Sequence, residues 1–159
     1  MPQSLAAIDR IRAGAAARYL ASRMASARAH AVMRSTHVAL RFEEESSGIS
    51  FRMFADGNGN GVRTADIAAD VDSPLDTSVL LSDLFPGVAI AVSGSAGTDA
   101  VRLGATNLLS FTPLGTATAG SIYVRGRDGS QFAVRILGTT GRTRLQQYIE
   151  RTRAWIDTP

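Results

Sequence analysis

The segment AARYLASRMASARAHAVMRSTHVALRF, residues 16–42, changes its hydrophobic period within a short stretch of chain. From about Ser4 to Ser35 the sequence is rich in alanine and has no internal proline, and Gly14 is its one helix-weakening residue. This composition favours one long helix. After the helix, Val38, Leu40 and Phe42 alternate with other residues, which is typical of a strand. We therefore predict a long helix that leads directly into a sheet.

The expected helix carries a narrow stripe of small and apolar side chains. The stripe recurs at three- and four-residue steps and comprises Ala13, Ala16, Leu20, Met24, Ala27 and Ala31. Small side chains let another surface approach closely. We expect the C-terminal half of the helix to lie on the protein's own sheet, with the N-terminal half open to partners.

Alternating patterns continue beyond the helix. Residues 38–42 and 49–53 read as a hairpin joined by the polar connection EEESSG. Further strands are expected at 79–81, 88–92, 101–103, 108–112, 121–125 and 132–137, and the last two flank a tight turn at Asp128-Gly129. Strands without intervening helices pair in antiparallel fashion.

The tail has a different pattern, because Thr143 and Gln146 match a capping box and apolar residues follow at helical spacing. It predicts a short C-terminal helix whose Tyr148 and Trp155 either cover the core or form a docking patch. The expected fold class is α+β: a long N-terminal helix at 1–36, an antiparallel β head at 37–142, formed by two packed sheets, and a helical extension at 143–159.

Composition argues against most kinds of catalytic site. All 17 basic residues are arginine and there is no cysteine, which excludes lysine Schiff bases, thiol nucleophiles and zinc knuckles. His30 and His37 lack the spacing of paired metal ligands, and the string SGSAG at 93–97 begins with serine where a nucleophile elbow needs glycine. Solvated loop charge accounts for three nearby carboxylates, Asp70, Asp72 and Asp76. We expect a protein that is not an enzyme.

Charge is distributed unevenly along the chain. Residues 1–42 hold seven arginines and one acid, residues 43–124 hold three arginines and ten acids, and residues 125–153 hold seven arginines and two acids. Basic ends around an acidic middle favour head-to-tail contacts between copies, or an anionic partner at one end.

One loop resembles a calcium site in part. Asp56, Asn58 and Asn60 place oxygen side chains at positions 1, 3 and 5, with Gly61 at position 6. Ile67 occupies the twelfth position, where a calcium loop has glutamate, although Asp66 and Asp70 lie near enough in sequence to close the site differently. A plain Asn-Gly turn uses the same residues, so both interpretations stay open.

Four segments together resemble the GspH/FimT family of type IV pilin-like minor pseudopilins and minor pilins. They are the helix and strand quoted above, the string FRMFADGNGNGVRTAD at 51–66, LSFTPLGTATAGSIYV at 109–124 with its F-x-P-x-G turn, and RILGTTGRTRL at 135–145 with its G-R-x-R end. The resemblance implies a pilin fold and a hydrophobic half-helix that anchors the subunit in the bacterial inner membrane, with the head in the periplasm.

No apolar run in the sequence is long enough to cross a bilayer, so we expect this stretch of chain to be water-soluble. The simplest hypothesis is that the sequence begins inside the family's helix, with Met1 and Pro2 near the point where that helix leaves the membrane.

The arginines of the C-terminal third form the best candidate for an anion-binding surface. They comprise Arg125, Arg127, Arg135, Arg142 and Arg144, with Arg151 and Arg153 further on. In FimT-type pilins, the resemblance implies, a basic C-terminal region including the G-R-x-R arginines contacts DNA, and Arg142 and Arg144 match those positions. Solvated or subunit-facing charge is the alternative interpretation, and the extra tail could cover these arginines.

The sequence thus predicts a minor pseudopilin or minor pilin that is not an enzyme and acts in assembly or at the tip of a type II secretion pseudopilus or type IV pilus. Its partners would be other pilin subunits, contacted through the helix and the head. The alternatives are a DNA-binding minor pilin and a calcium-dependent interaction module.

Overall fold

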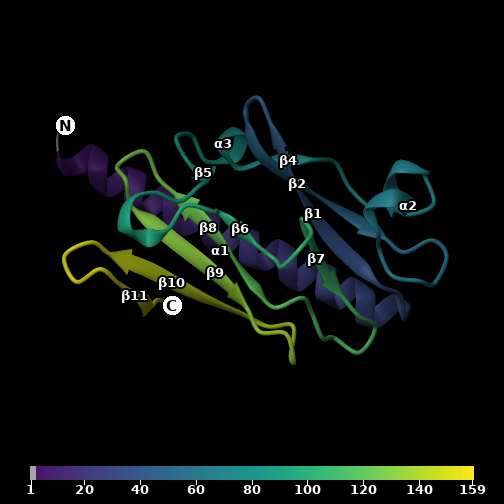
Figure 1. The fold of residues 1–159 in the computed structure, drawn as a ribbon. Coiled ribbons are helices and arrows are strands. Elements are labelled where there is room, and N and C mark those ends of the chain that lie inside the picture. The colour runs from purple at the N-terminus through teal and green to yellow at the C-terminus, as the bar shows by residue number, and fades with distance from the viewer. Residues whose placement is uncertain (1–2) are drawn as a thin grey trace.

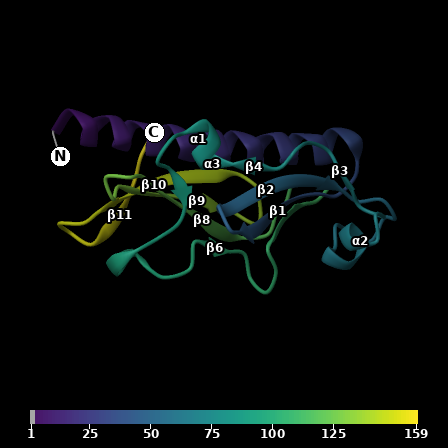
Figure 2. The same ribbon diagram turned by 90° about the horizontal axis from the view of Figure 1, so that it is seen from above.

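A long helix lies along one side of two antiparallel sheets in the computed structural model, which describes residues 3–159 (Figures 1 and 2). The prediction that Met1 and Pro2 lie near the point where the helix leaves the membrane concerns residues outside the described range. Helix α1 spans Gln3–Arg34, as the alanine-rich composition predicts. It ends where Ser35 takes a left-handed φ of 50° and the Thr36 amide donates to the Ala31 carbonyl at 3.1 Å. This is the bond of a Schellman cap, which satisfies a carbonyl at the helix end.

The small-residue stripe of α1 is fully buried, which confirms the predicted sheet contact of the C-terminal half and shows that Ala13 and Ala16 of the N-terminal half are covered as well. All six stripe positions are 0% exposed. Burial also reaches Gly14 and Asp9, further toward the N-terminus than the sequence led us to expect. In the first two turns of α1, Asp9 is the one buried residue.

The first sheet is built on the predicted hairpin of β1 (Val38–Glu45) and β2 (Gly48–Ala55). These strands pair from Val38↔Ala55 to Glu45↔Gly48, so only Ser46 and Ser47 form the turn, which is shorter than predicted. The sheet is completed by three short strands, β3 (Ser73–Pro74), β4 (Val79–Leu80) and β7 (Leu108–Phe111). Two short helices flank it, α2 (Thr64–Ala68) and α3 (Leu81–Leu84).

The second sheet has the order β11-β10-β9-β8-β5, with β6 also paired to β8. Its strands are β5 (Ala89–Ile90), β6 (Val101–Arg102), β8 (Gly120–Arg125), β9 (Gln131–Ile136), β10 (Thr143–Ile149) and β11 (Ala154–Asp157). A short 3-10 helix, η1 (Gly94–Ala96), lies between β5 and β6. The predicted turn at Asp128-Gly129 is confirmed, because Gly129 has a φ of 89°.

The predicted C-terminal helix is wrong: residues 143–159 contain the hairpin of β10 and β11 instead. Strand β10 pairs with β9 from Thr143↔Ile136 to Gln147↔Phe132, and β11 then pairs with β10. Without β10, this edge of β9 would present unpaired backbone groups, and pairing with β10 satisfies them. Gln146 does not complete a capping box; its side chain accepts a hydrogen bond from Arg135 and donates one to Asp157.

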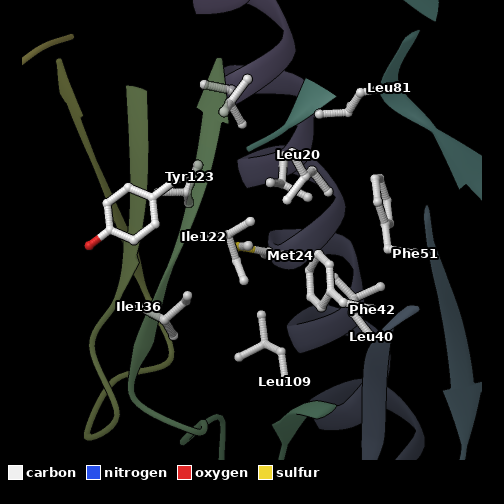
Figure 3. Close-up of a cluster of buried hydrophobic side chains, with 14 of the residues drawn as sticks. Leu20, Met24, Leu40, Phe42, Phe51, Leu81, Leu109, Ile122, Tyr123 and Ile136 are labelled. Carbon is white, nitrogen blue, oxygen red and sulfur yellow. The ribbon is translucent and has the colours of Figure 1, made fainter. Parts of the chain in front are cut away.

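Both sheets share one core with α1, which agrees with the predicted fold of a long helix and an antiparallel β head. Figure 3 shows Leu20 and Met24 of α1 between Phe42 and Phe51 of the first sheet on one side and Ile122 of the second on the other. Tyr123 points to the opposite face of β8. The helix therefore packs its buried stripe against one side of both sheets (Figure 2).

Candidate functional site

The F-x-P-x-G and G-R-x-R motifs meet at one side chain of α1. The Arg28 Nε–H donates to the carbonyl oxygens of Gly115, at 3.0 Å, and Thr140, at 2.8 Å. Gly141 has a φ of 66°, and a Cβ placed on it would lie 2.2 Å from the Gly115 carbonyl oxygen. Glycine is thus required there by both backbone conformation and close approach. We call this arrangement of Arg28, Gly115, Thr140 and Gly141 the Arg28 junction.

The four arginines proposed for DNA lie at opposite ends of the second sheet. Arg125 ends β8 and pairs with Gln131, whereas Thr143 pairs with Ile136 at the far end of β9. These two positions on β9 are five residues apart, which corresponds to about 17 Å along the strand. The structure therefore keeps Arg125 and Arg127 together and Arg142 and Arg144 together, but does not unite the two pairs.

The individual arginines also differ in their surroundings. Arg142 is exposed and lines a shallow hollow with Arg28 and Thr143. Arg144 lies 3.4 Å from a carboxylate oxygen of Asp157, which neutralises part of its charge. Arg135 does not face solvent freely, because its guanidinium donates to Gln146, Ser121 and Tyr123. Of the arginines proposed for an anion-binding surface, Arg135 and Arg144 therefore already have partners within the protein.

The tail folds back on the protein's own sheet. Of the two interpretations of Tyr148 and Trp155, a cover for the protein's own body or a docking patch, the structure agrees with the first. The ring of Trp155 lies 5.1 Å from that of Tyr148 and 5.3 Å from that of Tyr123. Arg135 lies over Trp155 at 5.4 Å, and Arg102 lies over Tyr123 at 4.8 Å. This stack of rings and guanidinium groups covers the face of β8 and β9 that points away from α1.

Asp56 organises its glycine-rich loop through backbone hydrogen bonds. One carboxylate oxygen accepts from the amides of Asn58 and Gly59, and the other accepts from the Gly61 amide at 2.8 Å. Burial opposes ionisation of the carboxyl, but these three hydrogen bonds, together with His37, hold the pKa of Asp56 below its ordinary value. The contact with His37, whose Nδ1 lies 3.8 Å from Oδ2, was not foreseen from the sequence.

The other proposed calcium ligands contribute little to a shared site. Asn58 donates its side-chain amide to Asp66 at 3.4 Å, and Asn60 donates its backbone amide to Asn58. Within residues 3–159, no three histidine, cysteine, aspartate or glutamate side chains come together in a way that could hold a metal ion. The described loop has the hydrogen bonds of the plain turn.

The interpretation of Asp72 and Asp76 as solvated loop charge is wrong. Asp72 is 1% exposed and accepts the backbone amides of Gly57 and Arg63. Asp76 forms an ion pair with Arg23 of α1 and accepts the Met53 amide of β2 at 2.9 Å. Both carboxylates therefore connect segments distant in sequence, a role that local patterns do not reveal.

The first turns of α1 expose large apolar side chains. Ile8 is 44% exposed and Ile11 is 67% exposed, whereas Ala13 and Ala16 on the sheet side are fully buried. Residues three apart on a helix are neighbours, so Ile8 and Ile11 form one ridge, which we call the helix ridge. Leu5, one turn before Ile8, is 49% exposed.

A long helix packed along antiparallel sheets, with an apolar ridge left open near its start, defines a pilin-like fold. The comparison with family models makes the assignment specific. The model described as "Type II transport protein GspH" matches residues 16–141, and the chain belongs to this family. The matched range includes the Arg28 junction, and the match confirms the family predicted from the sequence.

Among solved structures, the type IV minor pilin FimU of Pseudomonas aeruginosa strain PAO1 is similar to this chain. The two are 15% identical, the match covers 94% of this chain and 90% of the other, and the TM-score is 0.44. No curated protein sequence matches the chain. Among residues 3–159, no helix is both long and apolar enough to cross a membrane.

Proposed function

We propose that this protein is a minor pseudopilin or minor pilin subunit, without enzymatic activity, that joins a filament through the open face of α1. The helix ridge carries this proposal. Ile8 is 44% exposed and Ile11 is 67% exposed, whereas the stripe from Ala13 to Ala31 on the same helix is buried against the sheets. Full burial of an isoleucine side chain stabilises a contact by about 1.5–3 kcal/mol, so covering the ridge would contribute roughly half of that per residue.

Membership of the GspH family supports a place in a type II secretion pseudopilus, and a type IV pilus is the alternative machine. In either filament we infer a role in assembly or at the tip, with the head in the periplasm and the N-terminal end of α1 toward the inner membrane. The partners are neighbouring pilin-like subunits. The acidic middle and basic ends of the chain would orient these neighbours.

The experiment is an assembly assay in the cell, with the full-length protein carrying Ile8→Asp and Ile11→Asp. We expect the double variant to fold, since both side chains are exposed, but to lose co-purification with the other filament subunits. Met33→Asp is the matched control, because Met33 is 82% exposed at the other end of α1. Normal assembly of the Ile8→Asp/Ile11→Asp variant would contradict the proposal.

The absence of cysteine allows a direct test of proximity. A single Ile11→Cys change, combined with single cysteines in a neighbouring subunit, should yield a disulfide-linked pair under mild oxidation. A cysteine at Ala16, which is buried against the sheets, should not crosslink.

A further inference from the structure

Five arginines gather around the N-terminal turns of α1. Arg10 and Arg12 lie on α1, Arg127 lies in the turn between β8 and β9, and Arg151 and Arg153 lie in the turn between β10 and β11. Figure 1 shows both turns at the same end of the molecule as the purple start of α1, and Figure 2 shows this end from another side. Arg10, residues 128–131 and residues 147–150 line one hollow, so the three segments adjoin. We call these five arginines the basic pole.

Most of this positive charge is free. Arg10, Arg127, Arg151 and Arg153 are exposed, and among residues 3–159 none of the four takes part in an ion pair. The fifth, Arg12, is paired: its guanidinium nitrogen lies 3.8 Å from a carboxylate oxygen of Asp9.

The acids near the pole only partly offset this charge. Within the three segments that carry the arginines, they are Asp9, Glu150 and Asp128, and the Asp128 carboxylate accepts from the amide and hydroxyl of Ser130. Five arginines against three carboxylates leave an excess of two positive charges.

The opposite end of the molecule has the opposite character. It carries α2 and the C-terminal end of α1, where Asp56, Asp66, Asp70 and Asp72 outnumber two exposed arginines, Arg34 and Arg63. The chain is therefore polarised along the axis of α1, and an anionic partner would meet it at one end. A polyanion that coats the whole protein does not fit this distribution.

The shape of the basic pole favours a flat partner. Its arginines come from three segments that meet at one end of the molecule, so they spread over that end, whereas a nucleic acid is better matched by a stripe that follows its backbone. Leu5, in the first turns of the same helix, is 49% exposed. Arginines beside an exposed leucine are typical of surfaces that settle at a lipid headgroup boundary.

We propose that the basic pole binds the anionic phospholipid surface of the membrane from which the subunit assembles. This inference deepens the proposed function and rests on it, since that function turns the N-terminal end of α1 toward a membrane. The contact would hold the head upright before it enters the filament, with the acidic end pointing away from the lipid.

The test is vesicle flotation with vesicles of phosphatidylglycerol and phosphatidylcholine, compared with phosphatidylcholine alone. We expect binding only to the anionic vesicles, and weaker binding as the ionic strength rises to about 0.15 M. Each arginine near such a surface contributes about 1 kcal/mol, which corresponds to roughly a 5-fold change in affinity. The Arg151→Gln/Arg153→Gln variant should therefore bind about 25-fold more weakly.

The matched control is Arg34→Gln/Arg63→Gln, which removes the same charge from exposed arginines near the other end. It should bind anionic vesicles within about 2-fold of the unmodified protein, allowing for long-range screening. Equal losses in the two variants, or no binding to anionic vesicles at all, would overturn the lipid contact. Binding to duplex DNA that depends on Arg151 and Arg153, without vesicle binding, would overturn it in favour of a nucleic acid.

The two proposals fail separately. If vesicles are not bound but the helix ridge variant still blocks assembly, only the lipid contact is wrong. If the helix ridge variant assembles normally, the proposed function is wrong whatever the vesicles show.

Discussion

Replacing Arg28 with alanine should destabilise the protein more than replacing the exposed Arg18 of the same helix. The Nε–H of Arg28 is shared between two carbonyl oxygens that belong to loops 87 and 112 residues away. A hydrogen bond from a charged group contributes about 1.5–3 kcal/mol, and partial exposure lowers that value. We therefore expect a loss of about 2 kcal/mol in the free energy of unfolding.

The measurement is urea unfolding followed by circular dichroism. With a slope of about 2 kcal/mol/M for a chain of this size, the loss should move the midpoint by about 1 M. Arg18→Ala is the control, because Arg18 is an exposed arginine of the same helix, and its unfolding free energy should change by less than about 0.5 kcal/mol. Both changes replace arginine with alanine in a helix, so helix propensity cancels in the comparison.

Gly141→Ala tests the same junction from the other side. Its left-handed backbone and the 2.2 Å approach to the Gly115 carbonyl predict a cost of at least about 1–2 kcal/mol. The double variant Arg28→Ala/Gly141→Ala should cost less than the sum of the single changes, because both disturb one contact. Equal stability of Arg28→Ala and Arg18→Ala would refute the role of the junction.

Three further predictions concern separate parts of the molecule. Because the pKa of Asp56 is lower in the folded protein, its charge stabilises the fold above about pH 4, and this contribution is lost as the pH falls through the folded pKa. Asp56→Asn should therefore weaken the dependence of the free energy of unfolding on pH in this range. An unchanged pH dependence would contradict the hydrogen bonds assigned to the Asp56 loop. Calcium titration by calorimetry tests the calcium interpretation of that loop, and a saturable heat that Asp56→Asn abolishes would support it. Asp76→Ala should cost about 3 kcal/mol in unfolding experiments, because it leaves the partly buried Arg23 without its carboxylate; a loss no larger than that of a surface substitution would contradict this. Trp155→Ala should cost about 2 kcal/mol and release the C-terminal hairpin to proteolysis, while an unchanged digestion pattern would show that the ring stack does not hold the tail.

Local patterns predicted the elements that local physics controls. The alanine-rich composition fixed α1, and its stripe from Ala13 to Ala31 identified the buried face, because both depend on the period of one helix. Alternation predicted the β1–β2 hairpin, and Asp128-Gly129 predicted the turn between β8 and β9. The family followed from four separated strings whose order and spacing are properties of the sequence itself.

The candidate site depended on contacts that no local pattern encodes. The arginines of the C-terminal third are close in sequence, but the register of β8, β9 and β10 sends Arg125 and Arg142 to opposite ends of a sheet. In the sequence Asp72 and Asp76 resemble solvated loop charge, because the residues that contact them come from other parts of the chain. Arg28 gives no sign in the sequence that it will connect two distant loops.

The amino-acid sequence by itself determined that this chain is a long helix followed by antiparallel strands, because periodicity and composition act over a few residues. Its resemblance to pilin-like subunits came from the order and spacing of four motif strings. The tertiary structure alone decided that the tail is a hairpin. Thr143–Ile149 fits a helix and a strand about equally, and the free edge of β9 supplies the backbone hydrogen bonds that select the strand. The same pairing places Arg151 and Arg153 beside the start of α1, so the basic pole exists only in the folded molecule.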